Sequence, residues 1–292
     1  MRLAVSSLAW DPSQDDEARA TLVRRGITGL EVAPLAYWPE APHVAPKVLA
    51  EFRDRVAGIG VTVVALQGIL FGKPELQLFG TSAQQAALED HLAGMAKLAS
   101  TLGARVLVLG APRNRLRGAL SEEDAIAAAT PLLTRVATVA AGNGVVLCVE
   151  PNPPRYGGDF AMAIADARRL VDAIDHPGFG LHLDAGAVQI NGEGDADVIE
   201  AAKSARHFHV SEIDLAPIGS GTVDHARLGG LLRRAEYNGW VSIEMNRNVP
   251  DSLVSRLDRA IDIAGEEYVG TRDGTVTATP VFDDWRTRDS GA

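Results

Sequence analysis

Four residues with metal-binding side chains stand at the ends of short apolar segments in the second half of the chain. Glu150, Asp184, His209 and Glu244 occur in the segments LCVE, LHLD, FHV and VSIE, and a loop-like stretch follows each of them. Three carboxylates and one imidazole suit Mn²⁺, Mg²⁺, Co²⁺ or Zn²⁺ better than a soft metal ion. A single polar residue at a strand end is ordinary, but a buried group of three carboxylates repels itself without a cation. The four residues together therefore predict a divalent metal site.

The spacing of these residues points to a repeating unit of the fold. They lie 34, 25 and 35 residues apart, which is enough for a strand, a loop and a helix. Strand-length apolar segments and amphipathic helical stretches alternate along the chain, as in parallel α/β proteins. Eight such units predict a (β/α)8 TIM barrel, in which the strand ends converge on one rim. A doubly wound open sheet is the alternative, but the first turn, SSLAWDPSQD, lacks its glycine-rich phosphate-binding pattern.

The elements that position the four residues can be placed along the sequence. Glycines precede five of the strands and are expected to supply left-handed helix caps. Ser121 and Asp124 are expected to form a capping box at the start of the fourth helix. Residues 1–269 are assigned to one catalytic barrel domain and residues 270–292 to a C-terminal tail without periodicity. The predicted strands are 2–6, 28–33, 61–67, 105–109, 145–150, 179–184, 206–211 and 240–244, a last helix covers about 251–266, and the glycines are Gly26, Gly60, Gly103, Gly144 and Gly239.

Composition narrows the class of protein. A net charge of -10 disfavours nucleic-acid binding, which depends on lysine and arginine. Cys148 is the single cysteine, so no intrachain disulfide is possible and a reducing compartment is expected. No apolar run approaches the roughly 20 residues that a membrane span needs, and the N-terminus lacks the pattern of a signal peptide. These features predict a soluble cytoplasmic protein that acts on a small molecule, without nucleic-acid or membrane partners.

The residues around the four candidate ligands resemble a known group of enzymes. The motifs VEPNP, LDAG, HFHVSE and SIEMN are similar to those of the sugar isomerase and epimerase superfamily of xylose isomerase-like TIM barrels, which includes ketose 3-epimerases, and the resemblance covers about residues 1–266. It implies that Glu150, Asp184, His209 and Glu244 bind one divalent metal ion, manganese foremost, with Mg, Co or Zn as alternatives. It also implies a homo-oligomer, either a dimer or a tetramer.

The same resemblance implies a reaction. Glu150 and Glu244 would be the catalytic acid/base pair of a metal-dependent isomerase or epimerase in carbohydrate metabolism. One carboxylate would remove a proton next to the carbonyl of a sugar or sugar-derived keto substrate, and the other would return a proton to the opposite face. The metal would stabilise the enediolate between these two steps.

Two departures from the ketose epimerases concern the substrate. Those enzymes usually have a histidine three residues after the aspartate ligand, where this chain has Ala187. They also tend to have an arginine shortly after the metal histidine, where this chain has Leu215 and Ala216. A free ketohexose is therefore not the expected substrate.

Other polar residues near the predicted rim are candidates for substrate binding. Strand alternation places His182, His207 and Cys148 on the same inward face as the metal ligands, one layer below them. We interpret His182 as a contact with substrate or with a ligand, or otherwise as a core histidine, and His207 and Cys148 as core residues. For each arginine near the rim taken separately, a solvated surface position is favoured over a contact with substrate. The candidate substrate-binding residues are His182, Glu31, Gln67, Arg113 and Arg247, with Arg115 and Arg117 in the same loop as Arg113.

Three other functions use the same residues differently. A dehydratase of the inosose dehydratase type would use the same metal and base but expel a hydroxyl group. Endonuclease-like phosphodiester hydrolysis is disfavoured by the acidic charge and by the single clear set of ligands. A binding protein with a vestigial metal site would bind no divalent ion.

Overall fold

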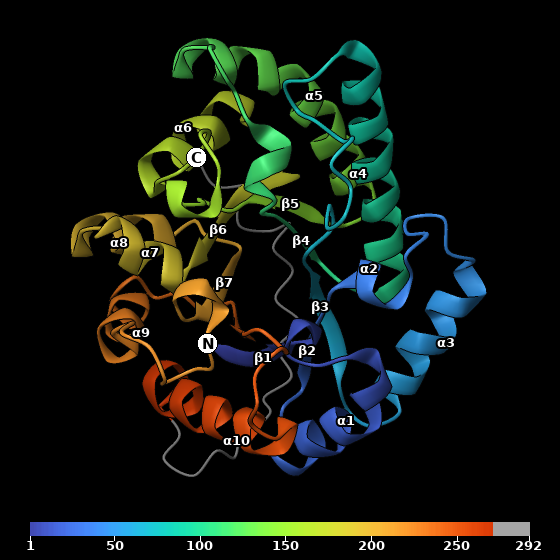
Figure 1. Cartoon of the computed structure of the whole chain (residues 1–292), viewed down its shortest axis with the longest axis vertical. Helices are drawn as coiled ribbons and strands as arrows, with labels where there is room; N and C mark the ends of the chain where they lie inside the picture. The colour runs from blue at the N-terminus through green and yellow to red at the C-terminus, as the bar shows by residue number, and fades with distance from the viewer. Residues whose placement is uncertain (271–292) are drawn as a thin grey trace.

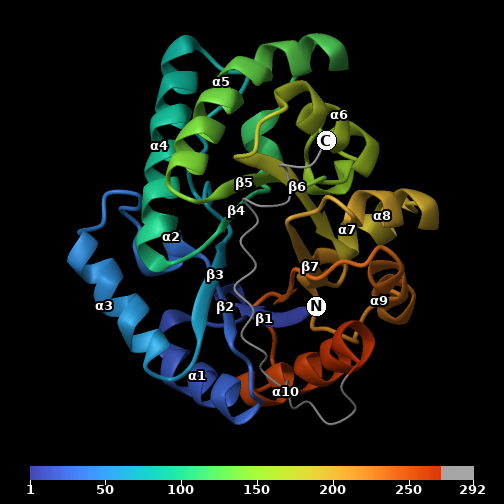
Figure 2. The same ribbon diagram turned by 180° about the vertical axis from the view of Figure 1, so that it is seen from behind.

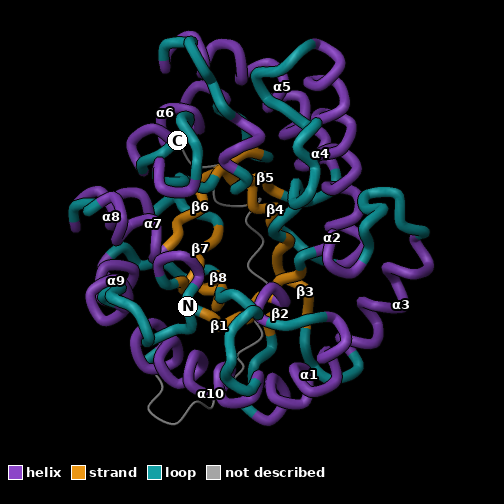
Figure 3. The backbone as a smooth tube through the Cα atoms, viewed as in Figure 1, coloured by secondary structure: helices purple, strands orange, loops and turns teal. Residues whose placement is uncertain are grey.

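A computed structural model of the chain describes residues 1–270 and shows a closed barrel of eight parallel strands (Figures 1 and 3). Each strand pairs with its neighbours in sequence, and β8 closes the barrel by pairing with β1. The predicted TIM barrel is thus confirmed. The strands are β1 Arg2–Ser6, β2 Gly29–Val32, β3 Thr62–Leu66, β4 Val106–Leu109, β5 Val146–Val149, β6 Phe179–Asp184, β7 His207–Ser211 and β8 Trp240–Glu244.

The α-helices surround the barrel on all sides, as the view from behind also shows (Figure 2). The expectation that no segment is long and apolar enough to cross a membrane is wrong for helix α5, which passes this test by length and composition. The helix nevertheless packs against α4, α6 and β5 as a helix of the barrel. The α-helices are α1 Asp15–Arg24, α2 Pro34–Tyr37, α3 Pro46–Ala57, α4 Ser82–Leu102, α5 Glu122–Gly142, α6 Ile164–Ile174, α7 Ala185–Asn191, α8 Asp195–Ala202, α9 His225–Arg234 and α10 Leu253–Ala264, and a π-helical turn, Gly265–Val269, follows.

The prediction that a left-handed glycine precedes five of the strands is confirmed in four cases. Gly26, Gly60, Gly103 and Gly144 have positive φ angles between 66° and 88°, as expected of residues that end a helix in the left-handed conformation. The prediction for Gly239 is wrong, because Glu236, with a φ of 55°, takes the left-handed conformation after α9. A side chain at position 239 would instead collide with the ring of Tyr237. Gly239 therefore serves close packing.

The predicted capping box at the N-terminus of α5 is half formed, because Ser121 caps the helix but the Asp124 carboxylate accepts from the Ser121 hydroxyl rather than from its backbone N–H. Ser121 lies just before Glu122, and its hydroxyl accepts a hydrogen bond from the Asp124 backbone N–H at 3.1 Å. This bond satisfies one of the free donors in the first helical turn.

The inside of the barrel is divided into an apolar half and a polar half. Strands β3 to β5 contribute Val64, Val106, Val108 and Cys148, which pack together. As expected of a core residue, burial raises the pKa of the Cys148 thiol to about 12. Strands β2, β6, β7 and β8 contribute buried polar side chains instead, namely Glu31, His182, His207, His209 and Ser242. Since barrel interiors are usually filled by apolar layers, this group of buried polar side chains is unusual and lies on the side of the barrel where three of the predicted metal ligands are found.

The predicted domain boundary stays a prediction. The barrel and the π-helical turn after α10 extend to Val269, and residues 271–292 of the predicted tail lie outside the described residues.

Candidate metal and active site

The four predicted ligands meet at the carboxyl ends of four adjacent strands. Glu150 follows β5 directly, Asp184 and Glu244 are the last residues of β6 and β8, and His209 lies within β7. One ligand atom from each residue lies within 4.8 Å of the others. The strand register brings them together, because Asp184 is paired with His209 and Ser211 with Glu244. We call these four residues the rim cluster.

The rim cluster is nearly sealed from water, so its charges interact strongly. Asp184 and Glu244 are each 7% exposed and His209 is 1% exposed. Burial and the charges of Glu150 and Glu244 raise the pKa of Asp184 to about 7. Burial also raises the pKa of Glu244. Mutual repulsion between the buried carboxylates contributes to both shifts, and a divalent cation would relieve it.

The two remaining members of the rim cluster offset part of this repulsion. Burial acts to lower the pKa of His209, but the carboxylates of Glu31, Glu244 and Glu150 outweigh it and hold the pKa well above its usual value. Burial acts to raise the pKa of Glu150, but His182 and His209 outweigh it and hold the pKa below its usual value. Among the three carboxylates of the rim cluster, Glu150 is thus the one that is most strongly kept ionised.

The donor set fits a hard or borderline divalent cation. His209 Nδ1 is buried without a hydrogen-bond partner and lies 3.2 Å from Glu244 Oε2 and 3.6 Å from Glu150 Oε1. The other ring nitrogen, Nε2, faces away toward Glu31. An unpartnered imidazole nitrogen aimed at two carboxylates is the arrangement that Mn²⁺, Co²⁺ or Zn²⁺ would complete.

A cavity of about 150 Å³ opens beside the rim cluster, between the ends of β3, β4, β5 and β8. Glu150 and Glu244 both line it, so the two predicted acid/base residues face the same space. Gln67 also lines it, and its side-chain amide donates to Ser6 Oγ at 2.6 Å. The remaining lining is backbone or apolar and consists of Gly68, Ile69, Val108, Gly110 and Ala111.

Two of the predicted substrate contacts lie deeper than the cavity. Glu31 is fully buried, is absent from the cavity lining, and accepts hydrogen bonds from His209 and Ser242. It therefore lies below the rim, where the sequence analysis had not placed it. His182 is also fully buried, and its Nε2 lies 3.4 Å from Glu150 Oε1. Burial and the charge of His209 lower the pKa of His182 to about 4, which keeps its ring neutral.

The two predicted substrate-binding arginines lie on the outer part of the rim. Arg113 is exposed, beside Gly157 of the neighbouring loop. Arg247 is partly exposed, and its guanidinium lies 3.8 Å from Asp11 in the loop after β1. A role in substrate binding stays a prediction for both.

Arg115 differs from the surface arginine that the sequence analysis favoured. It is 2% exposed, and its guanidinium donates to the backbone carbonyls of Gly110, Glu150 and Phe160 and to the Asn152 side chain. Asn152 in turn donates to Glu150 Oε2 at 3.1 Å. Arg115 thus ties the loop after β4 to the loop that carries Glu150.

We expect Arg115→Met to lower the free energy of unfolding by about 3–5 kcal/mol, because it leaves several buried carbonyls without a donor. Arg113→Met, two residues earlier and exposed, should change it by less than about 0.5 kcal/mol. Urea unfolding of the three proteins measures the difference. Equal effects of the two substitutions would contradict the role of Arg115 in holding the two loops together.

Gly110 is required by the close approach of Glu150. A Cβ atom at position 110 would lie 2.4 Å from Glu150 Oε2, and the flexible carboxylate, rather than the backbone, would have to move. We expect Gly110→Ala to fold normally but to lower metal affinity, and to reduce kcat/KM about a hundredfold, because small displacements of catalytic groups are costly.

Gly142→Ala is the matched control for this substitution, since no atom lies within 4 Å of a Cβ at position 142. A Gly110→Ala protein with the metal affinity of the control would contradict the steric argument.

Three residues that the sequence analysis did not single out border the site. Besides Asn152, they are Tyr156 and Asp214, from the loops after β5 and β7. The Asp214 backbone N–H donates to the Tyr156 hydroxyl at 3.2 Å, and Arg155 forms an ion pair with the Asp214 carboxylate. Burial and the charges of Asp184, Asp214 and Glu244 raise the pKa of Tyr156 to about 12. Of these three residues, only Asn152 could have been found from the sequence, because it stands two residues after Glu150.

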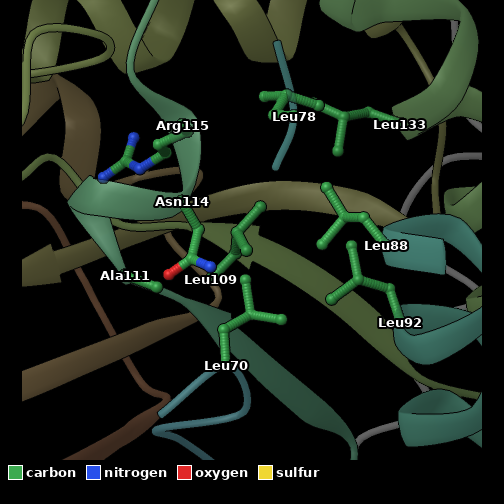
Figure 4. Close-up of a pocket in the computed structure, with 9 residues that line it drawn as sticks. All are labelled: Leu70, Leu78, Leu88, Leu92, Leu109, Ala111, Asn114, Arg115 and Leu133. Carbon is green, nitrogen blue, oxygen red and sulfur yellow. The ribbon is translucent and has the colours of Figure 1, made fainter. Parts of the chain in front are cut away.

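A second, much smaller cavity lies behind the loop after β4 (Figure 4). Its volume is about 10 Å³, which is room for at most one water molecule. Six leucines line most of it, and Asn114 and Arg115 close one side. It belongs to the packing of this loop on α4 and α5 and is too small for a substrate.

Solved structures with the same fold include several sugar epimerases. A D-psicose 3-epimerase from Clostridium cellulolyticum H10, solved with D-tagatose, is 16% identical, has a TM-score of 0.78, and aligns over 92% of this chain and 99% of its own. An L-ribulose 3-epimerase is 19% identical, with a TM-score of 0.78 and coverage of 96% and 99%. The IOLI protein, solved with a bound zinc atom, is 16% identical, with a TM-score of 0.71 and coverage of 91% and 99%. At these identities the likeness is one of fold.

Sequence comparison places the chain in a family. No protein of curated function matches it by sequence. Residues 20–265, most of the barrel, match the family described as xylose isomerase-like TIM barrel. This match agrees with the closed eight-stranded barrel and with the resemblance seen in the motifs. The chain therefore belongs to the xylose isomerase-like TIM barrel family.

Proposed function

We propose that this protein is a divalent-metal-dependent isomerase or epimerase that acts on a sugar or sugar-derived keto compound. The observation that carries the proposal is the position of Glu150 and Glu244. Both carboxylates belong to the rim cluster and both line the 150 Å³ cavity. Two carboxylates that face one small space can remove a proton from a carbon atom and return one to the opposite face.

The division of work follows from the environment of each residue. Asp184 and His209 are held in place, Asp184 by the backbone N–H of Ala187 and the hydroxyl of Ser211, and His209 by Glu31. When bound, the metal would supply positive charge next to the carbonyl oxygen of the substrate. Glu150, kept ionised by its neighbours, removes the proton next to that carbonyl, and Glu244 supplies a proton from the other side.

The substrate shell differs from that of ketose epimerases at two places. Ala187, where those enzymes usually have a histidine, is 3% exposed, and its backbone N–H donates a hydrogen bond to the Asp184 carboxylate. The backbone carbonyl of Leu215 accepts a hydrogen bond from the Asn246 backbone N–H at 2.7 Å. We assign substrate contacts instead to Gln67 and Tyr156, with Arg113 and Arg247 at the outer rim. His182, which is fully buried, is assigned to supporting Glu150 from below the cavity.

Deuterium exchange tests the reaction. The protein, loaded with Mn²⁺, is incubated in D₂O with a panel of ketoses and keto sugars, and the products are analysed by mass spectrometry and NMR. We expect deuterium at a carbon next to the carbonyl and a product with the formula of the substrate. A product that has lost water would identify a dehydratase instead. Absence of exchange with every compound, while metal is bound, would contradict the proposal.

Metal identity and assembly are tested separately. We propose Mn²⁺ as the cofactor, with Mg²⁺, Co²⁺ and Zn²⁺ as alternatives, and metal analysis of the purified protein distinguishes them. The composition leads us to propose a cytoplasmic protein. Family resemblance leads us to propose a homodimer or homotetramer, which light scattering would detect. A monomer at micromolar concentration would contradict the second proposal without affecting the first.

A further inference from the structure

A group of buried polar residues lies directly behind His209, on the side away from the cavity. Glu31 from β2, His207 from β7 and Ser242 from β8 contribute to it, and none of them is more than 1% exposed. We propose that Glu31 is a positioning residue for the metal site and that it fixes His209 so that Nδ1 presents its lone pair to the cation. This inference rests on the metal site of the proposed function and goes beyond it by assigning the group that controls metal affinity.

Glu31 holds His209 from across the barrel. Both of its carboxylate oxygens lie 3.1 Å from His209 Nε2, although the two residues are 178 positions apart in the sequence. An imidazole ring that coordinates a metal through one nitrogen keeps its proton on the other. Glu31 is the acceptor for that proton, and it therefore stabilises the ring with Nε2–H on the inside and Nδ1 toward Glu244 and Glu150.

The Glu31 carboxylate is itself immobilised. Ser242 donates its hydroxyl to Oε2 at 2.7 Å, and His207 Nε2 lies 3.2 Å from Oε1. The hydroxyl of Ser242 on β8 thus holds Oε2 by a hydrogen bond, and the ring of His207 on β7 packs beside Oε1. A carboxylate held in this way can orient His209 without moving itself, and its negative charge makes Nδ1 a stronger donor to a cation.

The position of Glu31 matters because His209 has carboxylates on both sides. Without an acceptor behind the ring, a proton on Nδ1 would be favoured by Glu244 and Glu150, and it would block the nitrogen that a cation needs. Glu31 opposes this arrangement. Its removal is therefore expected to weaken metal binding even though it is not a ligand.

The test compares Glu31→Gln with Glu212→Gln. Glu212 is a matched control because it is also a buried glutamate, 1% exposed, whose carboxylate lies 3.3 Å from a histidine, His225, outside the rim cluster. Zinc and manganese affinities are measured by titration against a competing chelator, without any sugar. We expect Glu31→Gln to raise the Kd of the metal by 10 to 100-fold and Glu212→Gln to change it less than about threefold. Equal Kd values for Glu31→Gln and the wild type, or equal losses in the two variants, would overturn the inference.

A second measurement uses the wild-type protein and does not depend on the folding of a variant. In the zinc-loaded protein with ¹⁵N-labelled histidine, NMR should show His209 with its proton on Nε2, in slow exchange with water and shifted downfield by the carboxylate. A proton on Nδ1, or a wild-type protein that binds no metal, would overturn the inference. Metal binding with this signature but no reaction with any sugar would instead contradict the proposed function alone.

Discussion

Replacing either Glu150 or Glu244 with glutamine is expected to lower the rate of substrate epimerisation by about a thousandfold or more. Glutamine has nearly the same shape but cannot accept a proton, and general acid–base catalysis typically contributes about 10² to 10⁴ in rate. Both residues line the cavity. The proposed reaction needs one of them on each face of the substrate, so neither is expected to take over the role of the other. Activity assays with each pure epimer, together with the metal content of each variant, measure the effect.

The deuterium exchange of the two variants distinguishes a two-base reaction from simple loss of the metal. With metal bound, the Glu244→Gln protein should still exchange the proton of the epimer that Glu150 serves, and the Glu150→Gln protein should exchange that of the other epimer. Glu200→Gln, an exposed residue of α8 that pairs with Lys203, is the control and should retain full activity. If both active-site variants exchanged both epimers at the wild-type rate, the two glutamates would not be the acid/base pair.

Metal affinity should rise with pH through neutrality. Burial and the charges of Glu150 and Glu244 raise the pKa of Asp184 to about 7, so below that pH the metal-free protein holds a proton that the cation must displace. His209, whose pKa is also raised, must likewise release a proton from Nδ1. For Asp184 alone, competition with the proton weakens binding by about tenfold between pH 8 and pH 6, and His209 adds to this.

The same linkage predicts the effect of pH on the stability of the metal-free protein. Because the folded pKa of Asp184 lies above its ordinary value of 3.8, the folded state holds this proton more tightly than the unfolded state does. Its contribution to stability therefore falls as pH rises from about 4 to 7.

The pH dependence of metal affinity is measured by isothermal titration with Mn²⁺ at several pH values, in buffers of different ionisation enthalpy. This experiment gives both the affinity and the number of protons released. Binding that does not change between pH 6 and pH 8 would contradict the assignment of Asp184 and His209 as ligands.

The packing of the loops around the site depends on contacts that no local sequence pattern predicts. Arg115, Arg113 and Arg117 occur in one short segment, and nothing in their spacing says which of them is buried. Arg115 is selected because the carbonyls of Gly110, Glu150 and Phe160 converge on its guanidinium. Such convergence exists only after the loops that follow β4 and β5 have packed together.

The depth of a side chain inside the barrel is another property that alternation along a strand does not predict. Alternation places Glu31 on the inward face, but its level relative to the cavity depends on the stagger between strands. The register shift between β2 and β3 at Leu30 and Glu31 is one such irregularity. Glu31 consequently faces His209 rather than the cavity, and a predicted substrate contact becomes the inferred positioning residue.

The amino-acid sequence by itself determined the order of elements, the barrel, and the position of four metal-binding side chains at strand ends. These properties follow from local periodicity and from the convergence of parallel strands on one rim. Only the tertiary structure decided how deeply each side chain is buried, which loops touch, and which nitrogen of His209 faces the cluster. Those properties arise from pairs such as Glu31 and His209, which are far apart in the chain and are brought together by the closure of the barrel.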